Sequence, residues 1–320
     1  MHFAEGEFSY GFYERCAAAT TWLADMTDRF VGEAPNLGAN DGARLFVLHR
    51  LPYRDYRPSV QWASVLFLQQ RRYANGPQDE VLPWLGLDAS TLPLSEDTGK
   101  ARLWPDGGYA KLASPHAWLV LRLPRYRFRP SQSDGLHLDI WVRETNLTCD
   151  AGSFSYNLSE QWLRYFNGTE SHNTVQFDGR DQMPRLSRFL FAEWLDCAEI
   201  AFDSSGNSVV ASYRDCWGAS HRRAVHLLPE GGCTVVDSVS GFRDRAVLRW
   251  RLAPLKSDWV GNAGVWCNGA VKIRVNASIP ISRLEMVTGW ESKYYGMKTA
   301  LSVLEAEVKF AATLTTEITW

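Results

Sequence analysis

The hydrophobic positions in the N-terminal part of the chain repeat with the period of α-helices. Between Tyr10 and Phe30, apolar side chains recur at steps of three and four residues and so share one helix face: Phe12, Cys16, Ala19, Leu23 and Met26. The same reasoning predicts helices over 43–49, from Ser59 onward with Ser59 as the N-cap, and around 80–85. The N-terminal part is therefore expected to be helical.

After about residue 100 the period of the pattern changes to that of β-strands. Short apolar or alternating runs are separated by Gly, Pro, Asn and Asp, at 117–123, 136–142, 209–213, 224–228, 233–239, 246–252 and 271–275. Pro229-Glu-Gly-Gly232 lies between two of these runs and predicts a hairpin. We therefore expect an α+β chain of two domains, a helical one over 1–98 and a large antiparallel β domain over 99–320.

Composition narrows the class of protein. The 320 residues carry 34 Lys+Arg against 36 Asp+Glu, a net charge of -2 that argues against a nucleic-acid-binding protein. No apolar run is long enough to predict a transmembrane segment, and the first residues lack the basic and apolar regions of a signal peptide. The six cysteines form no CxxC pair, which argues against a thiolate metal site.

Two residue types are unusually frequent. The chain has 14 Trp, whose rings stack on sugars but also fill sheet cores. Most of its positive residues are arginine, whose guanidinium matches a carboxylate in two-point contacts. Both features suit an acidic sugar ligand, although the tryptophans more often fill a core and genome composition alone can produce the bias to arginine.

The polar residues that could carry out chemistry are most concentrated between residues 127 and 190. In the run 136–141, strand periodicity places His137, Asp139 and Trp141 on one face, which either lines a cleft or faces solvent. Further along, Asp150 and His172 are either cation ligands or a buried pair in which the carboxylate orients the imidazole. Spacing alone does not decide between these readings.

Several motifs together resemble one known family. They are Pro35-Asn-Leu-Gly-Ala-Asn-Asp-Gly42, Asp55-Tyr-Arg-Pro58, Trp104-Pro-Asp-Gly-Gly-Tyr109, Asp134-Gly-Leu-His-Leu-Asp-Ile-Trp141, 150–157, 171–175 and 178–182. In this order they resemble the heparinase II/III-like proteins, which are polysaccharide lyases and relatives, including members from exopolysaccharide gene clusters. The resemblance implies part of an (α/α) toroid followed by an antiparallel β-sandwich, with the active cleft between them.

The resemblance also implies a reaction, the β-elimination of a polysaccharide that contains uronic acid. This chemistry requires neutralisation of the C6 carboxylate, a base for the C5 proton and an acid for the leaving oxygen. Here the candidates for proton transfer are His172, His137 and Tyr156. The candidates for binding the acidic polysaccharide are Asn157, Asn173, Arg188 and Trp141.

At one motif the chain departs from the family. Where the family commonly has a catalytic His followed by a zinc-ligating His, this chain has Pro130 and Gln132. The other zinc ligands correspond to Asp150 and His172. An amide oxygen is a poor replacement for imidazole on zinc. We therefore expect at most a degenerate zinc site at Gln132, Asp150 and His172, and no other cofactor.

The resemblance also indicates that toroid residues are missing upstream. Only 34 residues precede Pro35, so we expect the chain to be the C-terminal part of a longer protein. Two functions stay open: an N-terminally incomplete uronate-polysaccharide lyase, or a noncatalytic protein of polysaccharide binding or exopolysaccharide assembly. The polymer and the oligomeric state stay open. So does the compartment, with the bacterial cytoplasm and, for a longer precursor, the periplasm as the alternatives.

Overall fold

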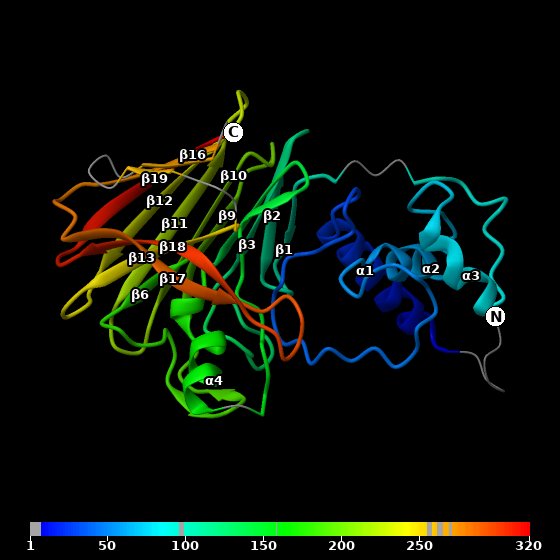
Figure 1. Ribbon diagram of the computed structural model, residues 1–320, viewed down its shortest axis with the longest axis horizontal. Helices are drawn as coiled ribbons and strands as arrows, with labels where there is room; N and C mark the ends of the chain where they lie inside the picture. Colours follow the sequence, from blue (N-terminus) through cyan, green and yellow to red (C-terminus); the bar gives the residue numbers. More distant parts are fainter. Residues whose placement is uncertain (1–7, 96–98, 158, 255–257, 261–264, 269–270) are drawn as a thin grey trace. The chain divides into compact units, whose positions relative to one another are not determined.

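The chain divides into two compact units. In a computed structural model we describe residues 8–95, 99–157, 159–254, 258–260, 265–268 and 271–320. One unit combines 1–35 with 43–99, and the other combines 36–42 with 100–320 (Figure 1). The short segment 36–42 thus belongs to the second unit, although the chain on both sides of it belongs to the first.

The first unit is built from short helices: α1 (Tyr10–Met26), α2 (Arg57–Leu68), the 3-10 helix η1 (Pro77–Glu80) and α3 (Val81–Trp84). Val65, Val81, Leu82 and Ala89 form a small buried apolar cluster in it. Among the described residues, no helix is long and apolar enough to cross a membrane.

Two expectations for this unit are wrong. No helix forms over 43–49, where Leu45 is 88% exposed and Phe46 and Val47 are each 75% exposed. A helix of seven residues is not stable without packing, and this apolar run is not packed. In addition, α2 begins at Arg57 after Tyr56, so Ser59 lies inside the helix and Pro58 occupies its first turn, where the missing N–H is not needed.

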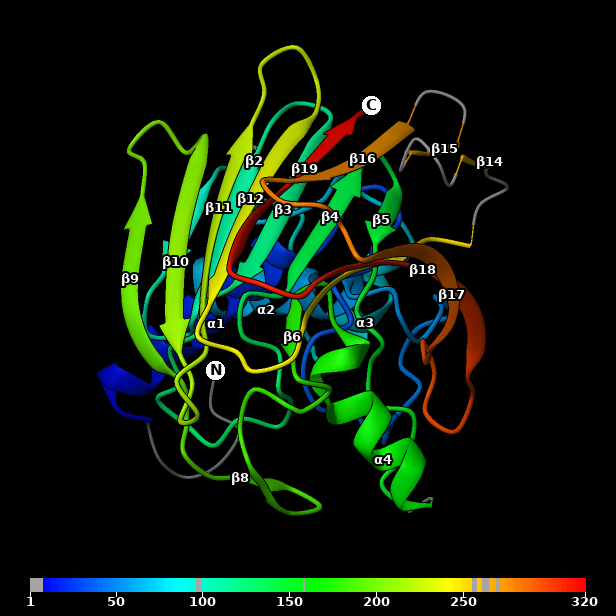
Figure 2. The same cartoon turned by 90° about the vertical axis from the view of Figure 1, so that its left-hand side faces the viewer.

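The second unit is an antiparallel β-sandwich. Its nine-stranded sheet has the order β1-β2-β3-β4-β5-β13-β18-β17, with β6 paired to β13, and its eight-stranded sheet has the order β14-β15-β16-β19-β12-β11-β10-β9. The two sheets lie as layers, one behind the other in Figure 2. In the first sheet the strands are β1 (Arg102–Trp104), β2 (Tyr109–Ala113), β3 (Ala117–Arg122), β4 (Leu138–Val142), β5 (Thr145–Thr148), β6 (Val175–Phe177), β13 (Ala246–Leu252), β17 (Arg283–Glu291) and β18 (Thr299–Val308).

The strands of the second sheet are β9 (Asp196–Phe202), β10 (Ser208–Arg214), β11 (Ser220–Leu227), β12 (Cys233–Ser240), β14 (Asp258–Val260), β15 (Val265–Asn268), β16 (Val271–Ala277) and β19 (Ala312–Thr319). All seven predicted strands are present, and β11 pairs with β12 across the predicted hairpin. Apolar side chains of the inner faces form one large core, including Leu119, Ile140, Val235 and Leu304.

Two short helices and a small sheet complete this unit beside the sandwich. They are the helix α4 (Glu160–Asn167), the 3-10 helix η2 (Thr169–Ser171) and a separate two-stranded sheet of β7 (Arg185–Ser187) and β8 (Leu190–Phe191). Figure 2 shows α4 below the ends of the strands. These segments carry most of the polar motifs noted in the sequence.

A fully buried arginine holds the loops that precede β4 and β6. Arg223 of β11 has a side-chain exposure of 0% and contacts the Asp237 carboxylate of β12 through Nε (2.7 Å) and NH2 (3.1 Å). Its NH1 donates to the carbonyl oxygens of Leu136 and Asn173, each at 2.6 Å. Since Leu136 has a φ of 61°, which a leucine rarely adopts, the guanidinium holds a strained turn in place.

The same strand offers a matched test of this role. We expect Arg223→Met to lower the free energy of unfolding by about 3–5 kcal/mol, because the buried Asp237 loses its cation and two carbonyls lose a donor. Its neighbour Arg222 lies on the surface with an ion pair to Glu199, so Arg222→Met is expected to cost less than about 1 kcal/mol. Urea unfolding of both variants measures the difference, and equal losses would contradict the role of Arg223.

The Asp237 cluster also predicts a pH dependence. Burial raises the pKa of this carboxyl, but Arg223 and His221 outweigh it and lower the pKa from 3.8 to about 2. A group whose pKa is depressed in the folded state stabilises the fold above its unfolded pKa, and this stabilisation is lost as the pH falls through the folded value. The destabilisation caused by Asp237→Asn should therefore shrink by about 2 kcal/mol between pH 5 and pH 2. Parallel stability curves for the two proteins would contradict it.

Candidate functional site

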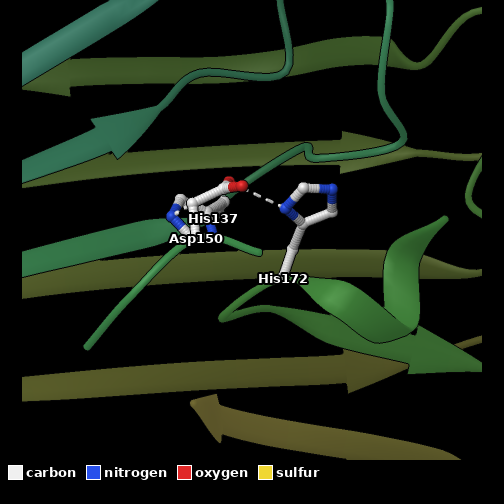
Figure 3. Close-up of side chains that lie close together, drawn as sticks. All are labelled: His137, Asp150 and His172. Carbon is white, nitrogen blue, oxygen red and sulfur yellow. Dashed lines mark hydrogen bonds and ion pairs between the residues drawn. The ribbon is translucent and has the colours of Figure 1, made fainter. Parts of the chain in front are cut away.

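The site centres on the carboxylate of Asp150, which lies between two imidazoles. Asp150 follows β5, His137 directly precedes β4, and His172 follows η2. Oδ2 of Asp150 is 2.9 Å from Nδ1 of His172 and 3.6 Å from Nε2 of His137. Figure 3 shows the His172 ring turned with one nitrogen toward the carboxylate and the other away from it. The structure thus brings together three residues that are distant in sequence.

Hydrogen bonds fix which ring nitrogens carry protons. The backbone N–H of Asn173 donates to Nδ1 of His137 at 2.9 Å, so this nitrogen is the acceptor and the proton of the neutral ring is on Nε2. In His172 the nitrogen that faces the carboxylate, Nδ1, is the donor. Nε2 of His172 has no hydrogen-bond partner among the described residues.

Burial governs the electrostatics of this cluster. His137 and His172 are 0% exposed and Asp150 is 1% exposed. Burial raises the pKa of the Asp150 carboxyl, but His172, His137 and the Gly152 N–H outweigh it, so the net pKa is lower than usual. For Asp139, 3.6 Å from His137, burial dominates and the pKa is raised. Asp150 is thus the favoured anion of the cluster.

The tautomers decide how well the cluster suits a metal ion. The ligand atoms of His137, Asp150 and His172 all lie within 4.8 Å of one another, close enough to surround one ion. However, zinc requires a lone pair, and Nε2 of His137 carries the proton while Asn173 occupies Nδ1. As hydrogen-bonded here, His137 does not fit as a ligand, and only Asp150 and His172 do.

Gln132 has other contacts. Its Oε1 accepts from the Gly38 N–H at 3.1 Å, and its Nε2 donates to the Gly152 carbonyl at 3.3 Å. Both ends of the amide thus tie loop 36–42 to the turn after Asp150. The residues present therefore do not make a well-formed metal centre.

Asn173 and Trp141, proposed from the sequence to bind substrate, both lie inside the protein. Asn173 is 0% exposed; its amide donates to the Leu138 carbonyl (3.0 Å), and its Oδ1 accepts from the Arg251 N–H (2.7 Å). Trp141 is 1% exposed and stacks on Trp118 with ring centroids 5.0 Å apart. The expected cleft-lining or solvent-facing side of β4 is instead buried, because these contacts cover it.

The other predicted residues lie nearer the surface. Tyr156 is half-buried, with its ring 5.3 Å from Phe189 and 5.6 Å from Tyr295. Burial raises the pKa of its phenol, against a hydrogen bond with Ser153 that lowers it, so the phenol keeps its proton at neutral pH. Asn157 and Arg188 are exposed. Since Arg188 precedes Phe189, the ring contact brings that part of the chain to Tyr156.

Sequence reasoning did not place the segment 36–42 at the site. It runs beside the turn after Asp150, where Asn36 donates to the Ser292 carbonyl (2.8 Å) and the Asn40 N–H donates to Ser153 Oγ (2.9 Å). The backbone N–H of Tyr156 in turn donates to the Tyr295 hydroxyl at 2.9 Å. The motif at 35–42 was recognisable, but its partners are more than ninety residues away in sequence.

The comparisons with known proteins agree on one fold. A family model described as "Heparinase II/III-like, C-terminal" matches residues 96–316. No curated protein matches the chain. A solved heparinase III with methylated lysines is 15% identical with a TM-score of 0.73, over 98% of this chain and 46% of that one.

Two further solved structures show the same likeness. A crystal structure of heparinase III is 12% identical with a TM-score of 0.71, over 98% of this chain and 49% of that one. The heparan sulfate lyase HepC from Pedobacter heparinus is 13% identical with a TM-score of 0.70, over 98% of this chain and 47% of its own. The chain therefore spans about half the length of the structures it matches, and the likeness is one of fold.

The tautomer of His137 leads to a prediction about metal. We expect dialysis against EDTA to leave the melting temperature unchanged. The reason is that the Asp150 carboxylate is held by a hydrogen bond from His172, and His137, whose Nδ1 accepts from Asn173, has no free nitrogen for a metal ion. Metal analysis before dialysis is expected to find less than one zinc ion per ten chains. A stoichiometric zinc ion whose removal lowers the melting temperature, and whose binding His137→Gln abolishes, would contradict this structure of the site.

Proposed function

The chain belongs to the heparinase II/III-like C-terminal family, and from this premise we propose that it acts on a polysaccharide containing uronic acid, by β-elimination. The family match over 96–316 carries the proposal. The named heparinases and the heparan sulfate lyase that share the fold support it. The alignments also extend over the helices of the first unit, which supports their assignment as part of an (α/α) toroid.

In this proposal Tyr156 donates a proton to the leaving oxygen. Its phenol remains protonated at neutral pH because burial raises its pKa, and the side chain is only half-buried. Arg188, exposed beside Phe189, pairs with the substrate carboxylate and favours the loss of the adjacent C5 proton. In this proposal the C5 proton passes to a water molecule, its electron pair forms the C4–C5 double bond as the C4–O bond breaks, and the Tyr156 phenolate regains a proton from solvent. The Asp150 cluster, which is enclosed, holds the loops that carry these groups.

The proposed acid is tested by removing its hydroxyl. Tyr156→Phe should lower kcat/KM at least about 100-fold, the usual effect of losing a general acid. The assay follows the ultraviolet absorbance of the unsaturated product formed from heparan sulfate, alginate or hyaluronan. Tyr10→Phe is the control, since Tyr10 is 79% exposed in α1. Full activity of the Tyr156 variant would remove this residue from the reaction.

A second candidate function is a noncatalytic one, the binding of acidic polysaccharide or a part in its assembly. It is favoured by the burial of His137 and His172, which no polymer reaches while the loops around them stay closed. Pro130 and Gln132, at positions where family members have His, also favour it. Retention on a column of immobilised polysaccharide, without any absorbing product, would support this function over the lyase.

A further inference from the structure

A large pocket lies on the second unit, between α4 and the β7–β8 hairpin. Its volume is about 1110 Å³, ample for more than one sugar ring. It is lined by residues of α4 and of the segment 179–188, which includes β7, and by Trp217 and Trp290. None of its lining residues belongs to the Asp150 cluster, but Arg188, assigned above to the substrate carboxylate, lines the pocket.

Arginines dominate the charge of the pocket, and two of the four have close partners. Arg164 pairs with Glu160 at 2.6 Å, one turn away on α4. Arg180 pairs with Asp215 at 2.7 Å and stacks on Trp217, its guanidinium carbon 4.0 Å from the ring centre. The charges of these two arginines are therefore balanced by carboxylates of the protein, and their side chains form part of the pocket lining.

The third arginine has one long ion pair. Arg185 has a side-chain exposure of 14%, and its guanidinium carbon lies 4.7 Å from the centre of the Phe191 ring. Its nearest carboxylate oxygen, Oδ2 of Asp181, is 3.5 Å away, and the other oxygen of Asp181 accepts from the Thr169 N–H. A largely buried guanidinium held by a single long ion pair gains from a second, closer oxyanion.

Two further features define the ligand. Arg188 lies exposed at the same rim, and Trp217, 40% exposed, offers an aromatic surface against which the apolar face of a sugar packs. Glu170 opposes the positive charge, but it is exposed and Arg249 lies near it. The lining therefore suits a ring that carries one negative group better than a bare ion.

We propose that this pocket binds the carboxylate or sulfate group of an acidic sugar, with Arg185 as its principal partner and Trp217 beside the ring. The choice of a sugar rests on the proposed function, whereas the oxyanion site rests on Arg185 alone. The same chemistry is also met by a free inorganic sulfate, and the experiment separates the two sources.

Calorimetric titration of the full chain tests the pocket with glucuronate, glucose and inorganic sulfate as probes. Glucuronate should bind at least tenfold more tightly than either of the other two. Arg185→Gln should weaken glucuronate binding at least tenfold, and Arg188→Gln by a smaller factor. Arg214→Gln, an exposed arginine of β10 outside the pocket, is the control and should bind as the parent does.

Three outcomes would overturn the proposal: glucuronate binding no tighter than glucose, sulfate binding as tightly as glucuronate, or Arg185→Gln binding like the parent. If Arg185→Gln fails to fold, titration of Trp217→Leu decides in its place, because Trp217 lines the pocket and has no part in the proposed reaction, and this variant should bind glucuronate more weakly than the parent. The readout does not depend on catalysis. Lyase inactivity with intact glucuronate binding would therefore reject the proposed reaction and keep the pocket.

Discussion

The buried guanidinium of Arg223 is the constraint on which the end of the sandwich depends. A cation with no exposure is tolerated only where an anion and further acceptors surround it, and Asp237 together with two backbone carbonyls meets this requirement. The ion pair joins neighbouring strands of one sheet, while the carbonyls belong to loops of the other. The arginine therefore sets the distance between the sheets and the conformation of the loops at once.

The consequences reach the Asp150 cluster through the backbone. Arg223 holds the carbonyl of Asn173, whose N–H donates to His137, and holds the carbonyl of Leu136, the residue before His137. The backbone next to His137 is thus held by hydrogen bonds, and this fixes the position of the imidazole ring beside Asp150. A cluster positioned by so many fixed hydrogen bonds is rigid and closed, and this is why we assign it to the support of the site rather than to contact with a polymer.

The sequence predicted the β domain well because its signal is local. Alternation within β10 or β13 and the glycines of the hairpin at 229–232 determine the strands without knowledge of their partners. It failed at 43–49, where an apolar run has no packing surface, and at β4, whose polar face is covered by residues distant in the chain. The closeness of Asp150 and His172 was one of two readings, and only the fold around them shows His137 as their neighbour. Arg223 gave no signal at all, since an arginine next to Arg222 in a strand is typical of a solvated face.

The two polar regions of the second unit differ in how far a ligand can reach them, and this difference separates support from binding. Around Asp150, Nδ1 of His172 and the Gly152 N–H donate to the carboxylate and His137 lies 3.6 Å away, and all three side chains are at most 1% exposed. Around Arg185, the nearest carboxylate oxygen is 3.5 Å away, and Arg188 is exposed at the rim of the same pocket. Recognition of an acidic group is therefore expected at the pocket beside α4, where an arginine is open to solvent, and not at the enclosed His137–Asp150–His172 cluster.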